Sequence, residues 1–286
     1  RKLVDRAKGL LMSARQVNED EAFRLLRSAS MNAKQRIGQV SQQVIDAAQY
    51  GDAINRAGRL RMLSQRIVKL YALAAMGVEV AGSRALLADS GVQIDQSLAL
   101  LGRTLSRPTF GDLVDAVEVT WASLQHSLGA APVVACIATL DQDAERLLEL
   151  SERLTQALEN AGLAPTLHVI NISGRQRMLA QRLAKLALLR LGPPLSATDP
   201  LPAELAPTVD AFERGLRYLK DIPLSTATIR EGIAAADLRW QDMLSAVRSG
   251  GAPAARMTLA ATSEALLELF DHLTREYEQS MQLLIG

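Results

Sequence analysis

The chain has 286 residues and a net charge of +1 at pH 7, with 48% hydrophobic but only 3% aromatic residues. This length is enough for two or three domains. So few aromatic residues favour a core of Ala, Leu, Val and Ile packed helix against helix rather than in sheets. The nearly neutral charge excludes a global field that attracts nucleic acid, so any RNA-binding patch must be local.

The sequence lacks the signals that are typical of several classes of functional site. Cys136 is the one cysteine and lies in an apolar run, so we expect a small core residue rather than a reactive thiol. The histidines, His126, His168 and His272, have no metal-ligand spacing. No catalytic triad order, phosphate loop or dinucleotide-binding glycine pattern appears, so we expect neither an enzyme nor a metal site. No apolar run reaches the ~18 residues of a membrane helix.

The N-terminal 48 residues are predicted to form three short amphipathic helices. The second follows Asn18, which has Glu21 three residues later in capping-box spacing. Phe23 is expected among its core contacts. The third begins near Asn32, and no proline interrupts residues 33–76, so this helix could continue into the next segment. About 43 helical residues would span ~65 Å, a rod able to couple two domains.

One motif occurs twice. INRAGRLRMLSQRIVKL, residues 54–70, returns as INISGRQRMLAQRLAKL, residues 170–186, with 11 of 17 positions identical at an offset of 116. Apolar residues recur at helical spacing in both copies, so both are predicted helices. Residues 140–159 and 259–278 also correspond, at an offset of 119. The repeat therefore covers a whole unit, and it predicts two tandem, pseudo-symmetric helical bundles of the four-helix type.

The polar side of the repeated helix is matched as closely as its apolar side. Gly58 and Gly174 are equivalent, although glycine inside a helix costs roughly 0.5–1 kcal/mol relative to alanine. Close approach of a helix or a ligand to bare backbone would explain them. Arg61 and Arg177 follow one turn later, and guanidinium is a planar fork suited to small planar oxyanions. If the two helices pack face to face, an anion between the arginines would remove their repulsion.

These residues also have a purely structural interpretation. Repeated arginines make ion pairs at helix interfaces, and Arg66 and Arg182, on the flank of the helix, are expected to do so. Asn55 and Asn171 could equally donate to an anion or cap the helix locally.

The pattern N-x-x-G-R-x-R-M-L-x-Q-R resembles the P-box of bacterial nitrate/nitrite sensors. The P-box is shared by the sensing domain of pilus-type methyl-accepting chemotaxis transducers and by the NIT domain of nitrate-responsive antiterminators. The resemblance implies helical bundles that hold the anion between paired P-box helices, with the arginine before the methionine as an anion contact. By position, the candidate nitrate- or nitrite-binding residues are Arg61, Arg177, Gly58, Gly174, Asn55 and Asn171.

The segments RAKGLLM, EDEAFRLLR and SMN resemble the ANTAR domain, an RNA-binding module of transcription antiterminators. The resemblance implies leader-RNA hairpins as partners and two ANTAR domains per RNA, hence a homodimer. No aromatic stacking platform is expected, so recognition would depend on shape, phosphate contacts and hydrogen bonds to exposed bases. The candidate RNA contacts are Arg6, Lys8, Arg27, Lys34 and Arg36.

The sequence thus predicts an all-α, nitrate- or nitrite-responsive regulator of transcription antitermination. Its expected parts are an ANTAR domain at residues 1–48 and sensor bundles at 49–160 and 161–286. We expect no cofactor beyond the anion, and a cytoplasmic protein, because the membrane-anchored relatives carry an anchor that this sequence does not show. In the antiterminators compared, ANTAR follows the sensor, whereas here it precedes it. The alternatives are a helical scaffold that binds a partner protein and a sensor of a different small anion.

Overall fold

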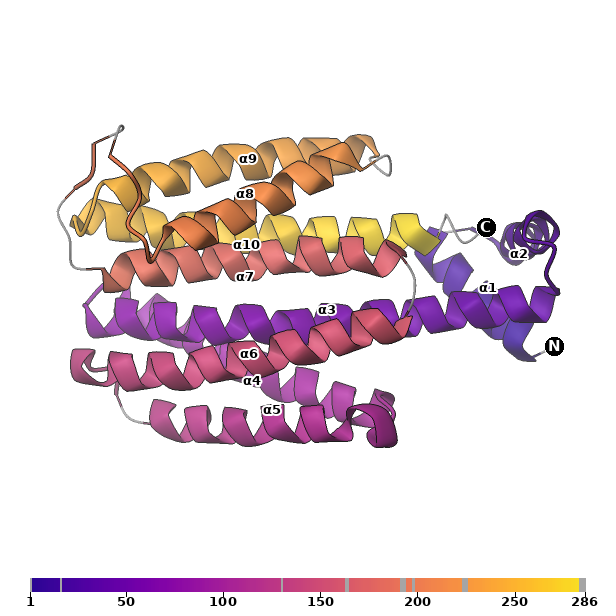
Figure 1. Cartoon of the computed structure of the whole chain (residues 1–286), viewed down its shortest axis with the longest axis horizontal. Helices are drawn as coiled ribbons and strands as arrows, with labels where there is room; N and C mark the ends of the chain where they lie inside the picture. Colours follow the sequence, from indigo (N-terminus) through magenta and orange to yellow (C-terminus); the bar gives the residue numbers. More distant parts are fainter. Residues whose placement is uncertain are drawn as a thin grey trace.

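The computed structural model describes residues 2–15, 17–129, 131–162, 165–190, 194–196, 199–222 and 226–282. Within these ranges every regular element is a helix, as predicted (Figure 1). The helices are α1 (Lys2–Arg15), α2 (Glu19–Asn32), α3 (Ile37–Ala75), α4 (Val80–Thr104), α5 (Arg107–Leu128), η1 (Val134–Cys136), α6 (Ile137–Gly162), α7 (Pro165–Leu189), α8 (Ala206–Asp221), α9 (Ala227–Arg248) and α10 (Pro253–Gln282).

The helices α1 and α2 and the first turns of α3 form a small cluster at one end of the molecule (Figure 1). Asn18 caps α2, since its side chain accepts a hydrogen bond of 2.9 Å from the backbone N–H of Glu21. The prediction that Phe23 is a core residue is wrong, because this side chain is 43% exposed. The residues of α2 that face the core are Ala22, Leu26 and Ala29, and this register turns Phe23 outward.

The rod predicted from the absence of proline is confirmed. Helix α3 has 39 residues without a break, which corresponds to about 58 Å. Its first turns lie in the N-terminal cluster, through Val40 and Val44, and the part from Ala53 onward lies in the core formed by the two repeats. One helix therefore belongs to both cores. It begins at Ile37, after a turn in which Lys34 has a φ of 52°.

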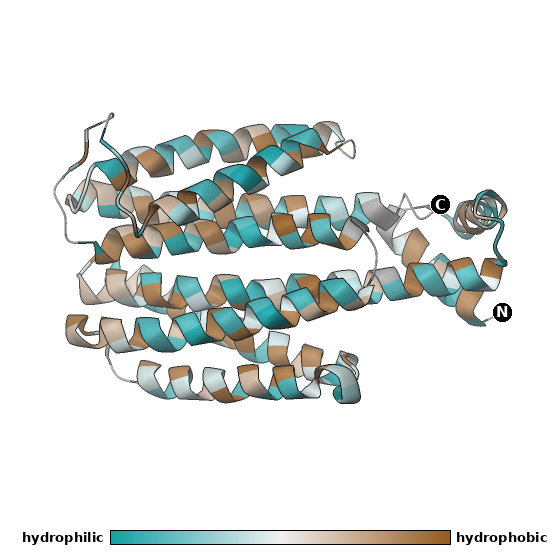
Figure 2. Cartoon of the chain, viewed as in Figure 1, coloured by the Kyte–Doolittle hydropathy of each residue, from teal (hydrophilic) through white to brown (hydrophobic). Residues whose placement is uncertain are grey.

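Each repeat forms one set of four long helices, α3 to α6 and α7 to α10. Helices α3 and α7, which carry the repeated motif, lie side by side in the middle of the molecule, with α6 and α10 packed against them (Figure 1). Figure 2 shows hydrophilic and hydrophobic residues interleaved along the helices. A single apolar cluster runs from Ala53 to Tyr277 through both repeats. The two repeats therefore share one core, centred on the repeated helices.

The repeats differ around an equivalent tryptophan. Trp121 on α5 donates a hydrogen bond of 2.7 Å from Nε1 to Asp95. Trp240 on α9 instead stacks on Phe212, with ring centroids 3.7 Å apart and planes 9° from parallel. The equivalent tryptophans are thus held by different side-chain contacts in the two repeats.

The expectation that Cys136 is a core residue is wrong. The cysteine is exposed, because it lies in the short helix η1 just before the buried face of α6 begins at Ile137. Among the described helices, none has an apolar stretch long enough to cross a membrane.

Candidate anion site

Arg61 and Arg177, on the adjacent helices α3 and α7, are both completely buried. A Cβ placed on Gly58 would lie 3.0 Å from Nη2 of Arg61 and 3.8 Å from Nη2 of Arg177. The two guanidinium groups therefore converge on one point of bare backbone. Burial lowers the pKa of Arg61, although Glu152 opposes this effect.

The two glycines make room for the arginines themselves. A Cβ on Gly174 would lie 2.9 Å from Nη2 of Arg177, too close without a shift of the guanidinium. Gly58 has the same relation to Arg61, three residues further along α3. Close approach of another helix or a ligand was expected at these glycines, whereas the nearest atoms belong to the arginines of the same motif, which fold back over the backbone.

Each arginine reaches across to the other repeat. Arg61 donates from Nη2 to Oδ1 of Asn171 at 2.7 Å, and Arg177 donates from Nη2 to Oδ1 of Asn55, also at 2.7 Å. The two hydrogen bonds are related by the internal symmetry of the repeat. The asparagines and arginines predicted from the motif are therefore brought together, with glycine beneath them.

A carboxylate pairs with each arginine from the outer side. Arg61 donates from Nη1 to Glu152 on α6 at 2.6 Å, and Arg177 donates from Nη1 to Asp271 on α10. Glu152 and Asp271 are equivalent positions of the repeat. Burial pushes the pKa of Glu152 upward, but Arg61 and Arg175 outweigh it and hold the pKa below its ordinary value. The carboxyl group is therefore ionised near neutral pH.

Each of these carboxylates also faces a second, more exposed arginine. Glu152 lies 3.6 Å from Nη1 of Arg175, whose side chain is 45% exposed. Asp271 lies 3.5 Å from Nη2 of Arg59, whose side chain is 37% exposed. A buried and an exposed arginine thus share one carboxylate in both repeats.

One donor of the buried pair has no partner. Among the described residues, Nε of Arg61 is buried and makes no hydrogen bond. Nε of Arg177 donates to the carbonyl of Gly174 at 3.3 Å, which is a long hydrogen bond. A buried donor without a partner costs free energy, so Nε of Arg61 can still donate a hydrogen bond to an acceptor that enters the site.

A second layer of buried charges ties the two repeats together further along α3 and α7. Lys69 donates to Glu264 on α10 at 2.5 Å, and Lys185 donates to the equivalent Glu145 on α6 at 2.6 Å. Both lysines are fully buried. The expected structural role of the flanking arginines is confirmed, since the residues that share these carboxylates are Arg66 and Arg182.

The asparagines are held by acidic residues on the side toward the N-terminal cluster. Asn171 donates from Nδ2 to Glu159 on α6, and Glu159 also lies 2.7 Å from Nδ1 of His168. The acid therefore has a basic neighbour in this half of the site.

The equivalent acid in the other half has an acidic neighbour. Burial raises the pKa of Glu278 to about 7, and Asp52 adds to this shift, while Arg177 and a hydrogen bond with Asn55 oppose it. Asp52 occupies the position that His168 has in the second repeat. Oε1 of Glu278 is buried without a hydrogen-bond partner among the described residues. The two halves of the site thus differ in the neighbour of the acid, which is His168 beside Glu159 and Asp52 beside Glu278.

We predict that Glu278→Gln stabilises the protein at pH 8 by about 1–2 kcal/mol, a value discounted because the carboxyl group is only partly buried. The folded state keeps the Glu278 proton up to about pH 7, whereas the unfolded chain releases it near 4.5. The free energy of unfolding therefore falls as the pH rises from about 4.5 to 7, and glutamine removes this loss. Urea unfolding at pH 4, 6 and 8 measures it.

The matched control is Glu268→Gln, which removes an exposed carboxylate from the same helix. An equal gain for both variants at pH 8, or a gain for Glu278→Gln at pH 4, would contradict the assignment.

The acidic partners of the site were not predicted from the sequence. They lie on α6 and α10, about 90 residues from the arginines that they contact. A signal did exist, because aligning residues 140–159 with 259–278 places an acidic residue at equivalent positions in both copies. These pairs are Glu145 and Glu264, Glu152 and Asp271, and Glu159 and Glu278.

The candidate RNA contacts lie apart from this site, on α1 and α2 and at the start of α3. The exposed ones are Arg6, Arg27, Lys34 and Arg36. Lys8 differs, because its ammonium group pairs with Glu19 at 2.5 Å and with Asp5 at 3.0 Å, and its side chain is 15% exposed. Lys8 therefore helps to hold α1 against α2, and the other four are the more accessible cations.

Comparison with known families agrees with this architecture. The model of the N-terminal region of type IV pili methyl-accepting chemotaxis transducers matches residues 46–148 and 163–267. The ANTAR domain model matches residues 1–45. No curated protein and no solved structure shows significant similarity to the chain. Each of the two matched sensor segments contains one copy of the repeated motif.

Proposed function

We propose that this chain, which belongs to the family of type IV pili methyl-accepting chemotaxis transducer N-terminal domains and carries an ANTAR domain, is a nitrate- or nitrite-responsive regulator of transcription antitermination. In this proposal the anion binds between Arg61 and Arg177, and the ANTAR domain binds hairpins of leader RNA as a homodimer. The protein acts as a switch and not as an enzyme.

One observation carries the sensing half of the proposal. Two fully buried guanidinium groups from different repeats converge above Gly58, and no described residue accepts a hydrogen bond from Nε of Arg61. Planar guanidinium groups suit a small planar oxyanion, and a buried anion at the interface would bind both repeats at once. An anion that prefers one packing of the repeats would shift the population toward that packing.

The continuity of α3 supports a coupling between anion and RNA. The helix that carries Arg61 also carries Val40 and Val44 of the ANTAR core. A change in the packing of α3 against α7 therefore moves the RNA-binding end directly. Exposed cations at that end, such as Arg27 and Lys34, are suited to phosphate contacts.

Isothermal titration of the full chain with nitrate, nitrite, formate and chloride tests the sensing half. We expect saturable heat with a stoichiometry near one for nitrate or nitrite and none for chloride, together with a higher Tm in the presence of the bound anion. Saturation only with formate would favour the sensor of a different small anion. No heat and no thermal shift with any of these anions, in folded protein dialysed free of anion, would favour the scaffold function instead.

A further inference from the structure

In the described structure, each of the two buried arginines already has a carboxylate partner. Arg61 and Arg177 each pair with one carboxylate, Glu152 and Asp271, through the Nη1 donor. A carboxylate presents two oxygens in a plane, much as nitrate does. An anion that enters between the arginines comes close to these carboxylates and needs the same guanidinium donors, and the repulsion between like charges is strong in a desolvated site. The anion and the carboxylates therefore compete for the two buried arginines.

We infer that Glu152 and Asp271 are internal competitors of the anion, released from the buried arginines when it binds and transferred to Arg175 and Arg59. This inference rests on the proposed function and describes how the same site is regulated.

Each carboxylate lies close to both its buried and its exposed arginine, so moving from one to the other requires only a small change in the side chain. Glu152 already contacts Arg61 at 2.6 Å with Oε2 and Arg175 at 3.6 Å with Oε1. Its side chain is 32% exposed, so it is free to turn outward, whereas Arg61 is enclosed. Asp271, 27% exposed, has the same relation to Arg177 and Arg59.

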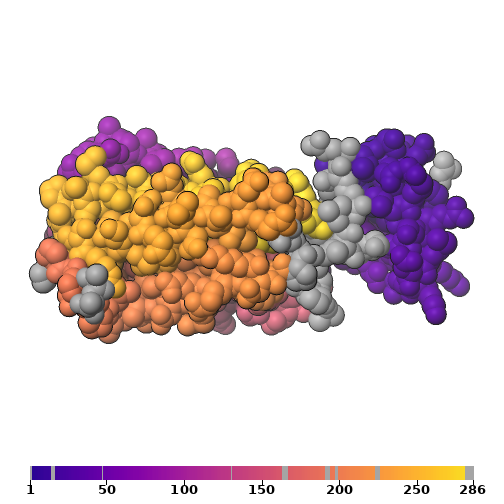
Figure 3. Space-filling model, turned by 90° about the horizontal axis from the view of Figure 1, so that it is seen from above, coloured from indigo at the N-terminus to yellow at the C-terminus, as the bar shows by residue number. Residues whose placement is uncertain are grey.

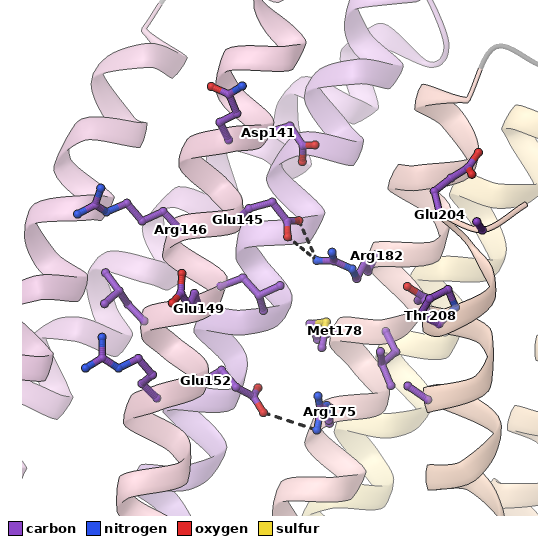
Figure 4. Close-up of a pocket in the computed structure, with 18 residues that line it drawn as sticks. Asp141, Glu145, Arg146, Glu149, Glu152, Arg175, Met178, Arg182, Glu204 and Thr208 are labelled. Atoms are coloured by element: carbon purple, nitrogen blue, oxygen red, sulfur yellow. Dashed lines mark hydrogen bonds and ion pairs between the residues drawn. The ribbon is translucent and has the colours of Figure 1, made fainter.

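A groove gives Glu152 the space to move and the anion a way in. Glu152 and Arg175 line a groove of about 1150 Å³ between α6, α7 and α8. Figure 4 shows the two side chains facing each other across it, with Glu149 further along α6. Glu152 thus lies between the solvent of the groove and the buried Arg61.

The position of α6 connects the movement of Glu152 to the N-terminal ANTAR domain. Glu152 ties α6 to α3 through Arg61, and α6 ends at Gly162 beside Tyr50 of α3. A Cβ on Gly162 would lie 3.4 Å from the side chain of Tyr50. Release of Glu152 removes this tie between α6 and α3, and the end of α6 lies against the part of α3 that leads into the ANTAR core. The internal competitors therefore set the anion concentration at which the switch responds.

Titration of nitrate into wild type, Glu152→Gln and Glu149→Gln tests the inference. Glutamine keeps the shape of Glu152 but not its charge, so we expect nitrate to bind at least tenfold more tightly. Glu149 lines the same groove on an exposed turn of α6, and its replacement removes the same charge without touching Arg61. We expect that control to change the Kd less than twofold.

A second pair of variants leaves both residues of the buried ion pair, Arg61 and Glu152, in place. Arg175→Gln removes the guanidinium group to which the released carboxylate moves, so nitrate should bind at least fivefold more weakly. Arg153→Gln removes an exposed cation from the same groove and should change the Kd less than twofold. Circular dichroism shows whether each variant is folded, and this second pair decides the question if Glu152→Gln is not.

The outcomes separate the inference from the proposed function. If wild type binds nitrate and Glu152→Gln binds no more tightly than Glu149→Gln, the competitor role is wrong while the sensor function stands. If Arg175→Gln and Arg153→Gln change the Kd for nitrate equally, the competitor role is likewise wrong while the sensor function stands. If neither wild type nor the folded Glu152→Gln/Asp271→Asn variant binds nitrate or nitrite, both are wrong. Binding by that double variant alone would support the competitor role most directly.

Discussion

Replacing Arg61 and Arg177 together by lysine should abolish saturable nitrate binding. Lysine keeps the positive charge but lacks the planar fork that holds an oxyanion with two parallel hydrogen bonds. Loss of a charged hydrogen bond costs about 1.5–3 kcal/mol, so two such losses weaken binding by at least about 100-fold. Isothermal titration against wild type measures the effect. Because both charges remain, Glu152 and Asp271 keep a cation near them, which protects the fold better than alanine would.

The control for this variant is Arg153→Lys, which makes the same chemical change on an exposed turn of α6. It should bind nitrate as wild type does. If the double lysine variant binds nitrate with the wild-type Kd, then Arg61 and Arg177 are structural arginines and the anion site lies elsewhere.

Introducing proline at Gln49 should uncouple the anion from RNA. Gln49 is exposed on α3 between the ANTAR core and the sensor core, so the change acts on the backbone. Proline inside a helix removes a hydrogen bond, clashes with the preceding turn and costs about 3 kcal/mol or more. We expect nitrate to bind with a Kd within about threefold of wild type, while the ratio of RNA affinities with and without nitrate falls to nearly one. Titrations with a labelled hairpin, at one fixed ionic strength, measure this ratio.

The Gln49→Ala variant removes the same side chain and preserves the helix, so it should keep the wild-type response. An undiminished nitrate response in folded Gln49→Pro would show that the signal passes around α3, for example through the contact of α10 with α1.

Most of what the sequence could predict came from the repeat. It fixed the all-helical architecture because a pattern that returns over a whole unit must satisfy the same packing twice. The rod α3 followed from the absence of proline. The burial of Arg61 and Arg177 was anticipated because a polar face that is repeated so closely is more readily explained by an interface than by solvent. The structure places each arginine beside the asparagine of the other copy.

What the sequence did not predict depends on contacts between distant helices. The pairing of Arg61 with Glu152 depends on the register of α6 against α3, which no local pattern specifies. The outward position of Phe23 follows from which residues of α2 meet α1 and α3. Lys8 looked like any other cation, yet its side chain lies between α1 and α2, where Glu19 comes within reach.

Arg61 and Arg177 lie on one polypeptide, and this affects how anion binding depends on the protein concentration. A site built from two subunits forms only as far as they associate, so the midpoint of its response depends on the protein concentration. Here the local concentration of one half around the other is fixed by the chain itself. The anion concentration at which the site itself is half occupied should therefore be the same in a cell that holds few copies and in one that holds many. The two halves are also free to diverge, as Asp52 and His168 already do.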